Sequence, residues 1–344
     1  MRRHLSPVRL AATGFVLLVV VAAVLWLVPA QGYYLFLPDT AHPLAPLVRV
    51  AGVQAQPDRN GGGIYFVDVR VRTPRLVERL FPGLDSGADL YPISAVRAPG
   101  VTEQEQQRED LYDMALSQRI AAAVALKRLG YHVTLVPTGV RVTDLDPKAP
   151  AARVLRPGDE IVAVDGAETP TIPRLRSALA RHRPGDAVHV RFRRGTRTRS
   201  VTVRTVPAPE NRRRAIIGFS PEQDLLVRLP LKIRIETRGV GGPSAGLAFA
   251  LQLMEELGRD VDHGYKVAAT GALDPDGSIE PIGGVKQKTI GAREAGVDVF
   301  LVPAGDNARI ARRYADGLRV ISVESFSQAL HALATLPPRG AASD

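Results

Sequence analysis

The pattern of apolar and polar positions begins with a long apolar run near the N-terminus. Residues 10–30 contain no charged side chain, and Arg2, Arg3 and Arg9 precede them. About 20 apolar residues suffice for a helix to cross a bilayer, and basic residues gather on the cytoplasmic side of such a helix. The pattern therefore predicts a cytoplasmic N-terminus over residues 1–9, a transmembrane anchor over residues 10–30 and an extracytoplasmic remainder.

A cleaved signal peptide is the alternative interpretation of the same run, with Val28-Pro29-Ala30 as its small-residue cleavage site. The run is longer than a usual signal core, and Pro29 lies beside the cut. We therefore favour a retained anchor, followed by a proline-rich linker over residues 31–46.

Two periodic segments follow the linker. Residues 64–72 alternate between an apolar face and a face that turns polar, which predicts a half-buried strand. Residues 102–129 predict one long helix, because Thr102 and Glu105 have capping-box spacing and Gly130 follows the last apolar residue.

The pattern changes twice in the remaining chain. From about residue 131 to 207, short strands and turns surround one helix over residues 171–181, which predicts a mainly β domain. From 208 to 336, apolar strands alternate with helices, which is typical of an α/β core. We expect residues 337–344 to form a disordered tail.

Composition narrows the classes of function. The formal net charge is +10 and the chain contains no cysteine, which excludes disulfides, thiolate metal sites and a cysteine nucleophile. Nucleic-acid binding is not expected, because neither an aromatic stacking platform nor a recognition motif accompanies the basic charge. We also expect no cofactor and no metal.

The middle segment contains the motif L-R-P-G-D-E-I-V-A-V-D-G over residues 155–166, with Gly139-Val140-Arg141-Val142 before it. This stretch resembles the PDZ domain in the arrangement common beside bacterial proteases. Such domains bind an extended peptide by adding it as a strand to a sheet edge beside a helix. The resemblance implies that residues 131–207 recruit peptide segments or C-termini.

The same resemblance implies a peptide groove. Backbone groups near Thr138, Gly139 and Val140 would receive a terminal carboxylate or an internal segment. The side chains that would line the groove are Val140, Val142, Leu175 and Leu179. The alternative is that these apolar residues only form the domain core, and the sequence does not decide between the two.

A strongly basic stretch, RHRPGDAVHVRFRRGTRTRS, ends the middle segment. One interpretation is a contact of Arg193, Arg194 and Arg197 with anionic lipid or wall polymer. We favour a solvated hairpin, whose charges discourage edge-to-edge strand pairing.

The stretch GGPSAG over residues 241–246 introduces candidate chemistry. It fits G-x-S-x-G, a pattern that often marks a nucleophilic serine, here Ser244. None of the seven histidines is well placed as its base. His331 formally fits the chain order of an α/β-hydrolase, but the approach to Ser244 is too long and glycine-rich for that fold.

Lysine is the other candidate base. A buried amine loses charge stabilisation, so its pKa falls and it can accept a proton near pH 7. Lys286 and Lys288 follow a Gly-Gly turn at the start of a predicted helix, whose N-terminus also disfavours a cation. Two residues apart on a helix, they point to different sides, and the pattern alone does not rank them.

Two motifs therefore lie in order: G-P-S-A-G over residues 242–246 and P-I-G-G-V-K-Q-K over residues 281–288, with Thr270 between them. Over residues 232–333 they resemble the proteolytic domain of Lon-type proteases, a Ser-Lys peptidase family. The resemblance implies that Ser244 is the nucleophile, Lys288 is the base and Lys286 is an exposed neighbour.

The mechanism follows from that resemblance. Neutral Lys288 takes the proton of Ser244, which attacks a peptide carbonyl and forms an acyl-enzyme. Backbone N–H groups near the turn would hold the oxyanion. The residues expected to support the dyad are Thr270, Gly242 and Pro243.

Two features depart from the family pattern. Many members carry Asp before Gly-Pro-Ser, where this chain has Gly241, so a charge partner of the lysine is missing there. The chain also has no G-x-x-x-x-G-K-[ST] motif, so we expect cleavage without ATP.

The whole chain resembles the membrane-anchored Lon-like proteases of bacteria that carry a PDZ module. This implies an α/β (α+β) Lon-type proteolytic domain over residues 47–130 and 208–336, with a mainly β PDZ domain inserted and one transmembrane helix. The expected function is an extracytoplasmic, ATP-independent serine endopeptidase acting on protein substrates at the cell membrane, and the family allows a homo-oligomer. The alternative is a catalytically inert adaptor that tethers C-termini.

Overall fold

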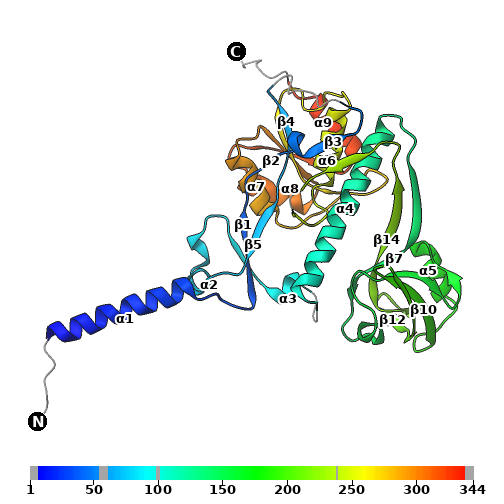
Figure 1. The fold of residues 1–344 in the computed structure, drawn as a ribbon, viewed down its shortest axis with the longest axis horizontal. Helices are drawn as coiled ribbons and strands as arrows, with labels where there is room; N and C mark the ends of the chain where they lie inside the picture. The colour runs from blue at the N-terminus through cyan, green and yellow to red at the C-terminus, as the bar shows by residue number, and fades with distance from the viewer. Residues whose placement is uncertain (1–6, 54–60, 98–100, 238, 338–344) are drawn as a thin grey trace, which may run out of the picture. The chain divides into compact units, whose positions relative to one another are not determined.

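The computed structural model describes residues 7–53, 61–97, 101–237 and 239–337, without the side chains of residues 7–11 and 84. The chain divides into two compact units, which Figure 1 shows as a ribbon. The first unit consists of Met1–Arg97 and Arg234–Asp344, and the second of Ala98–Ile233. The first unit is thus assembled from two separate stretches of chain.

The first unit is built on a sheet in the order β2-β4-β16-β19-β20. Its strands are β2 (His42–Pro43), β4 (Gly63–Phe66), β16 (Lys266–Ala269), β19 (Val299–Pro303) and β20 (Arg319–Val323). β4, β16, β19 and β20 run parallel, and β2 is antiparallel to β4. Parallel strands covered on both faces read as apolar runs, as in β19, where every residue is buried.

Four helices follow the strands of this unit. They are α6 (Gly246–Glu256), α7 (Val285–Glu294), α8 (Asp306–Tyr314) and α9 (Phe326–Ala334). α6 packs on β4 and β16 and is almost wholly buried, with the Phe249 ring 6.4 Å from that of Phe66. α7 and α8 share a second apolar cluster with Phe300 of β19. These two cores fix the ends of β16, α6 and α7.

Smaller elements complete the first unit. A second sheet has the antiparallel order β5-β1-β6, and two further strand pairs are β3 with β15 and β17 with β18. The bounds are β1 (Tyr33–Pro38), β3 (Val48–Val50), β5 (Val69–Arg72), β6 (Asp89–Pro92), β15 (Ile233–Ile235), β17 (Ala272–Leu273), β18 (Ile279–Glu280), α2 (Leu76–Leu80) and α3 (Ile93–Val96), with 3-10 turns at Ala45–Leu47 and Pro82–Leu84. The strand predicted over residues 64–72 is therefore broken at Val67 and Asp68, between β4 and β5.

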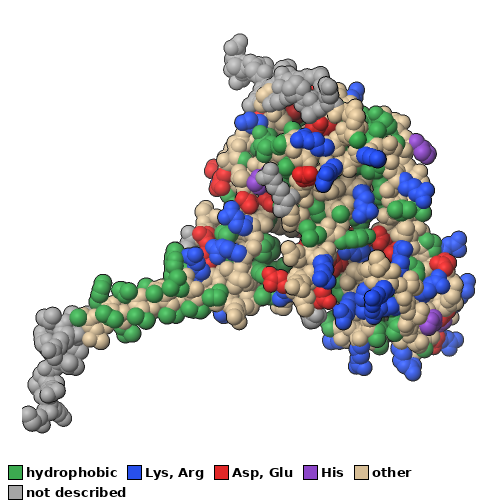
Figure 2. All heavy atoms as spheres, in the orientation of Figure 1, with side chains coloured by type: hydrophobic (Ala, Val, Ile, Leu, Met, Phe, Trp, Pro, Cys, Tyr) green, Lys and Arg blue, Asp and Glu red, His purple; other side chains and the backbone are tan. Residues whose placement is uncertain are grey.

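The predicted membrane segment coincides largely with helix α1 (Pro7–Leu27). Within the part of the chain that the structure describes, no helix combines the length and the apolarity needed to cross a membrane, so the expected span over residues 10–30 is not found. Figure 2 shows apolar side chains exposed along α1. Phe15, Leu18 and Trp26 are among them. The predicted N-terminal residues 1–6 and tail residues 338–344 lie outside the described ranges.

The second unit contains a mainly antiparallel sheet in the order β11-β10-β8-β7-β14, with β9 beside β8. The bounds are α4 (Glu103–Arg128), β7 (Thr134–Leu145), β8 (Glu160–Val164), β9 (Ala167–Glu168), α5 (Ile172–Leu179), β10 (Ala187–Arg194), β11 (Arg197–Arg204), β12 (Val206–Ala208), β13 (Asn211–Ile216) and β14 (Phe219–Arg228), with a 3-10 turn at Pro150–Arg153. One apolar core lies between this sheet and α5.

Helix α4 has the predicted start and end. The Thr102 hydroxyl accepts the Glu105 N–H at 3.2 Å, which completes the expected capping box. The helix was expected to belong to the catalytic fold, whereas the structure groups it with the second unit. The physical reason is Arg141 of β7, which is 4% exposed and pairs with Glu109 and Asp113 of α4 at 3.0 and 2.6 Å. A buried guanidinium needs such partners.

Candidate active site

Ser244 lies in the turn that leads into α6. Gly242 has a φ of +88°, which glycine adopts without steric cost, and Pro243 follows it. The Ser244 carbonyl oxygen accepts the Gly271 N–H at 2.8 Å and the Thr270 hydroxyl at 3.0 Å. These two bonds hold the turn against the end of β16, and the Ser244 side chain stays partly exposed.

Lys288 reaches Ser244 from α7. Its Nζ donates to the Ser244 Oγ at 2.6 Å and lies 3.4 Å from the Thr270 Oγ1. Lys288 is 4% exposed and Thr270 is fully buried. The structure thus brings together three residues from three separate elements, with the serine open to solvent and the lysine enclosed.

Burial changes the proton affinity of this lysine. It lowers the pKa of Lys288 to about 8, because the charged amine loses its hydration, and the charge of Asp68 opposes that shift. With that pKa, about a tenth of the amine is neutral at pH 7. The arrangement supplies a hydroxyl and a proton acceptor in direct contact.

Lys286 lies on another side of α7. Its Nζ is 2.8 Å from the Asp89 Oδ1 and also donates to the Ala88 carbonyl at 3.2 Å. The neighbouring Gln287 amide donates to the other oxygen of Asp89. Lys286 was expected to be an exposed neighbour, but its side chain is only 21% exposed and belongs to an ion pair.

Asp68 is a residue near the dyad that the sequence did not single out. It lies in the break between β4 and β5, and its carboxylate Oδ1 is 3.8 Å from the His42 Nε2. Burial and the nearby charge of Asp39 raise the pKa of Asp68. The available signal was one acidic residue within an apolar alternation, which is equally common at the end of an ordinary surface strand.

Position 241, where the family resemblance led us to look for an Asp, adds no acid here. Gly241 is exposed, as is Pro243 next to the serine. Of the charged groups in the described residues, Asp68 is the one whose charge acts on the pKa of Lys288. The electrostatic partner of the lysine therefore comes from the N-terminal part of the chain.

The groove residues expected in the second unit lie in its core. Val140 and Val142 are fully buried, and Leu175 and Leu179 are 4% and 5% exposed in the same cluster. Strand β7, which carries Thr138 and Gly139, pairs with β8 on one side and β14 on the other. A peptide can add only to a free strand edge, so the predicted backbone site on β7 is already occupied by the chain itself.

The free edge beside the helix is β14. This strand ends the sheet order, and α5 packs against both β13 and β14. The Gln223 side chain joins the two elements, since its amide donates to the Pro170 carbonyl at 2.8 Å and its oxygen accepts the Ile172 N–H at 3.3 Å. The edge strand and helix that peptide addition requires are therefore present, one strand away from the predicted place.

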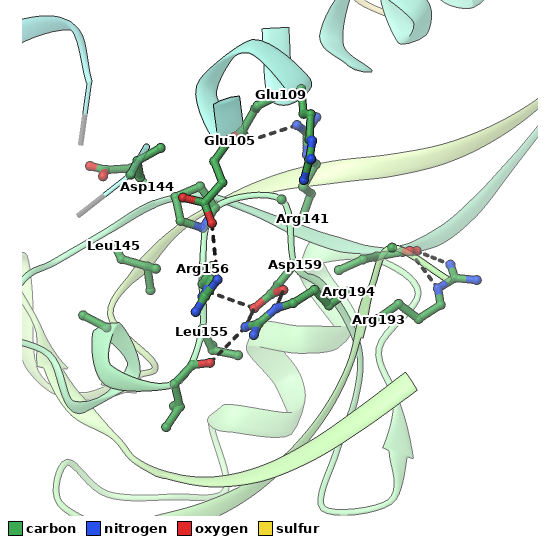
Figure 3. A pocket seen from close by; sticks show the side chains of 18 of the residues that line it. Glu105, Glu109, Arg141, Asp144, Leu145, Leu155, Arg156, Asp159, Arg193 and Arg194 are labelled. Atoms are coloured by element: carbon green, nitrogen blue, oxygen red, sulfur yellow. Dashed lines mark hydrogen bonds and ion pairs between the residues drawn. The ribbon is translucent and has the colours of Figure 1, made fainter. Parts of the chain in front are cut away.

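A cavity of about 1270 Å³ also lies within the second unit, between the start of α4, residues 144–160 and the tip of the β10–β11 hairpin (Figure 3). Four of the arginines that line it, Arg141, Arg156, Arg193 and Arg194, pair with acids of the same unit. Arg194 contacts Asp159 at 2.7 Å, and Arg193 pairs with Glu160. This pairing agrees better with a neutralised hairpin than with a surface of one charge for lipid or wall polymer.

Two groups among the described residues of the first unit have the spacing of a cation site, and the first consists of Asp39, His42 and Asp68. In the second, oxygens of Glu255, Asp260 and Asp262 lie within 4.8 Å of one another. Glu255 already accepts the Val261 and Asp262 N–H groups at 2.6 and 2.9 Å, so it closes the loop after α6.

Comparisons with known proteins give a family match for each of the two units. Residues 127–205 match the family model of the PDZ domain, and residues 236–335 match that of the Lon protease (S16) C-terminal proteolytic domain. The second match contains Ser244, Thr270 and Lys288.

Curated relatives are similar over the same part of the chain. Lon protease 2 of Bacillus subtilis is 30% identical over 124 residues, which cover 36% of this chain and 21% of the relative. Archaeal Lon protease of Methanothermobacter thermautotrophicus is 35% identical over 98 residues, covering 28% and 15%. The chain thus spans about a fifth or less of the length of these relatives.

Among solved structures, the PDZ domain of the SdrC-like protein from Listeria monocytogenes is 22% identical, with a TM-score of 0.23, and the likeness covers 24% of this chain and 87% of that one. The chain is thus similar to a PDZ domain over residues 127–205 and to the proteolytic domain of Lon proteases over residues 236–335.

Proposed function

We propose that this chain is an ATP-independent serine endopeptidase with Ser244 as nucleophile and Lys288 as base. The observation that carries the proposal is the 2.6 Å hydrogen bond between the buried Lys288 Nζ and the Ser244 Oγ. A lysine with a pKa of about 8 can accept a proton at physiological pH without a third residue.

The reaction starts with the neutral form of Lys288. As the Ser244 Oγ attacks the peptide carbonyl, its proton passes to the Lys288 Nζ, and a tetrahedral oxyanion forms. The backbone N–H groups of Gly242 and Ser244 in this turn would donate hydrogen bonds to that oxyanion. The Lys288 ammonium then gives its proton to the leaving amine, and the neutral lysine activates water to release the acyl group.

Thr270 contacts both Ser244 and Lys288 through its hydroxyl. Its hydroxyl donates to the Ser244 carbonyl, so the backbone of the nucleophile is fixed relative to β16. The same oxygen lies 3.4 Å from the Lys288 Nζ, where it accepts a hydrogen bond from the amine. Thr270 thereby orients both members of the dyad.

Peptide recruitment is proposed for the edge of β14 beside α5. Support comes from the position of β14 at the end of the sheet and from its packing with α5. An extended C-terminus or internal segment would pair with the β14 backbone and place alternate side chains against α5. A photo-crosslinking peptide should then label residues 216–228 of the full chain, whereas labelling confined to residues 134–145 would contradict this site.

The place of action is proposed to be the outer face of the cell membrane, with α1 as the attachment. Exposed apolar side chains along α1 and the basic residues before it support the proposal. Carbonate extraction of membranes, followed by protease treatment of intact cells, tests it. Recovery of the chain in the soluble cytoplasmic fraction would contradict the proposal.

Independence from ATP and self-assembly complete the proposal. The printed sequence contains no phosphate-binding loop motif, so added ATP should not change the cleavage rate. Resemblance to Lon-type proteases supports a homo-oligomer. Light scattering of the purified chain tests that assembly.

The decisive experiment is cleavage of an unfolded protein by the wild type and by Ser244→Ala. The wild type should cleave it, whereas Ser244→Ala should bind the same peptide and cleave nothing. The alternative function, an inert tethering protein, predicts equal binding and no cleavage by either form.

A further inference from the structure

The carboxylate of Asp68 is the feature that the proposed mechanism leaves unused. Its side chain is 18% exposed, yet its Oδ1 is buried and accepts no hydrogen bond from the described residues. Leaving a carboxylate oxygen buried without a partner is costly unless a charge compensates it. The Asp68 Oδ1 therefore needs a nearby positive charge in place of a hydrogen-bond donor.

Strand register and one close contact place the neighbours of Asp68 next to elements that hold Lys288. β4 runs parallel to β16 with Phe66 opposite Ala269, so the residues before Asp68 run level with Thr270. On the other side, a Cβ on Gly284 would meet the Val69 Cγ2 at 2.6 Å, and Gly284 accepts the Lys288 N–H one helical turn on. Asp68 is thus bracketed by two positions that border Lys288.

The charges around Asp68 also indicate an interaction with Lys288. Asp68 and Lys288 act on each other, since the acid raises the pKa of the lysine and the lysine lowers that of the acid. The other charged groups that face Asp68 are Asp39 and His42, and Arg70 pairs with Asp39 at 3.1 Å. Asp39, His42 and Asp68 each place one ligand atom within 4.8 Å of the others, and of these three groups Asp68 is the one whose charge acts on Lys288.

We propose that Asp68 is a positioning residue for peptide cleavage, whose carboxylate stabilises the ammonium form of Lys288 while that lysine holds the serine proton. The proposal rests on the proposed function. The proton moves from the Ser244 Oγ to the Lys288 Nζ and then to the leaving amine, and Asp68 takes up none of it. From the break between β4 and β5, its negative charge supplies what no residue supplies at Gly241.

The test is the pH dependence of kcat and kcat/KM for Asp68→Asn. Without the charge, the neutral form of Lys288 is favoured, so the acid limb of kcat/KM should move to lower pH by about half a unit or more. Because the ammonium is less stable after proton transfer, maximal kcat should fall by about tenfold or more. Asp68→Glu should restore part of both.

A matched control removes the acid beside the other lysine of the same helix. Asp89→Asn takes away the partner of Lys286 and should leave the acid limb in place. A fall in kcat for Asp68→Asn with an unmoved acid limb would mean that Asp68 only supports the fold, and it would overturn the proposal. Asp68→Ser provides a second neutral variant if Asp68→Asn does not fold.

A second readout separates this proposal from the proposed function. The chain has six lysines, so the ¹³Cε resonance of Lys288 can be assigned by substitution and titrated in Ser244→Ala. Adding Asp68→Asn to that protein should lower the pKa of Lys288, whether or not the wild type cleaves peptides. An unchanged titration would contradict the role of Asp68, whereas absence of cleavage by the wild type would contradict only the function.

Discussion

The sites predicted in the two units differ in how well the sequence specified them. In the first unit, Ser244, Thr270 and Lys288 are far apart in sequence and meet within hydrogen-bond distance. In the second, Val140 and Leu175 also meet, but in a core rather than in a groove. Residues whose chemistry requires one another specify a geometry, whereas apolar residues fit a groove or a core equally well.

The largest effect is expected when the two lysines of α7 are replaced one at a time. Lys288→Met should lower kcat/KM by about 10⁴-fold, because the serine loses its base. Lys286→Met should stay within about threefold of the wild type, since Lys286 pairs with Asp89 and not with Ser244. Cleavage of a fluorogenic peptide measures both, and similar losses in the two variants would remove the distinction.

The pH dependence gives the next largest effect. Only the neutral form of Lys288 accepts the serine proton, so activity should fall as pH decreases through the pKa of about 8. Two units below that pKa, at pH 6, kcat/KM should be about 100-fold below its alkaline plateau. Rates measured from pH 5.5 to 9.5 check this, and a plateau that extends unchanged to pH 6 would argue against a lysine base.

The sequence predicted most elements of the first unit because their patterns are strong. Buried parallel strands such as β19 read as apolar runs, and α6 begins directly after a glycine-rich turn. The break between β4 and β5 was not predictable, because alternation continues through Val67 and Asp68. That break decides where Asp68 lies, so the charge partner of Lys288 was missed with it.

The second unit shows the same limit in another form. A motif identified the domain, and the Thr102 cap predicted α4. Strand order depends on pairings between distant residues, such as Val140 with Gln223, and no local pattern encodes them. The edge strand and the placement of α4 against Arg141 therefore required the structure.

Truncation of Val140 tests whether this residue belongs to the core of the second unit or to a peptide groove. Val140→Ala should lower the free energy of unfolding of the second unit by about 2 kcal/mol, because the side chain is fully buried. Peptide affinity of the folded protein should change little. Thermal unfolding and fluorescence polarisation measure the two effects. Weaker peptide binding at unchanged stability would indicate that Val140 contacts the peptide.

Removing one hydroxyl gives the smallest predicted effect. Thr270→Val keeps the shape of the side chain but loses the hydrogen bond to the Ser244 carbonyl and the contact with Lys288. We expect kcat to fall about tenfold and stability by about 1 kcal/mol. Kinetics and thermal melting of the variant test this, and an unaltered kcat would assign Thr270 a purely structural role.

The central claim, that buried Lys288 activates Ser244, is tested most directly by acylation of the serine with a small β-lactone probe at varied pH. The rate of labelling should rise with an apparent pKa of about 8 and should be lost in Lys288→Met. Labelling at the same rate without Lys288, or a rise only near the ordinary lysine pKa, would contradict the account.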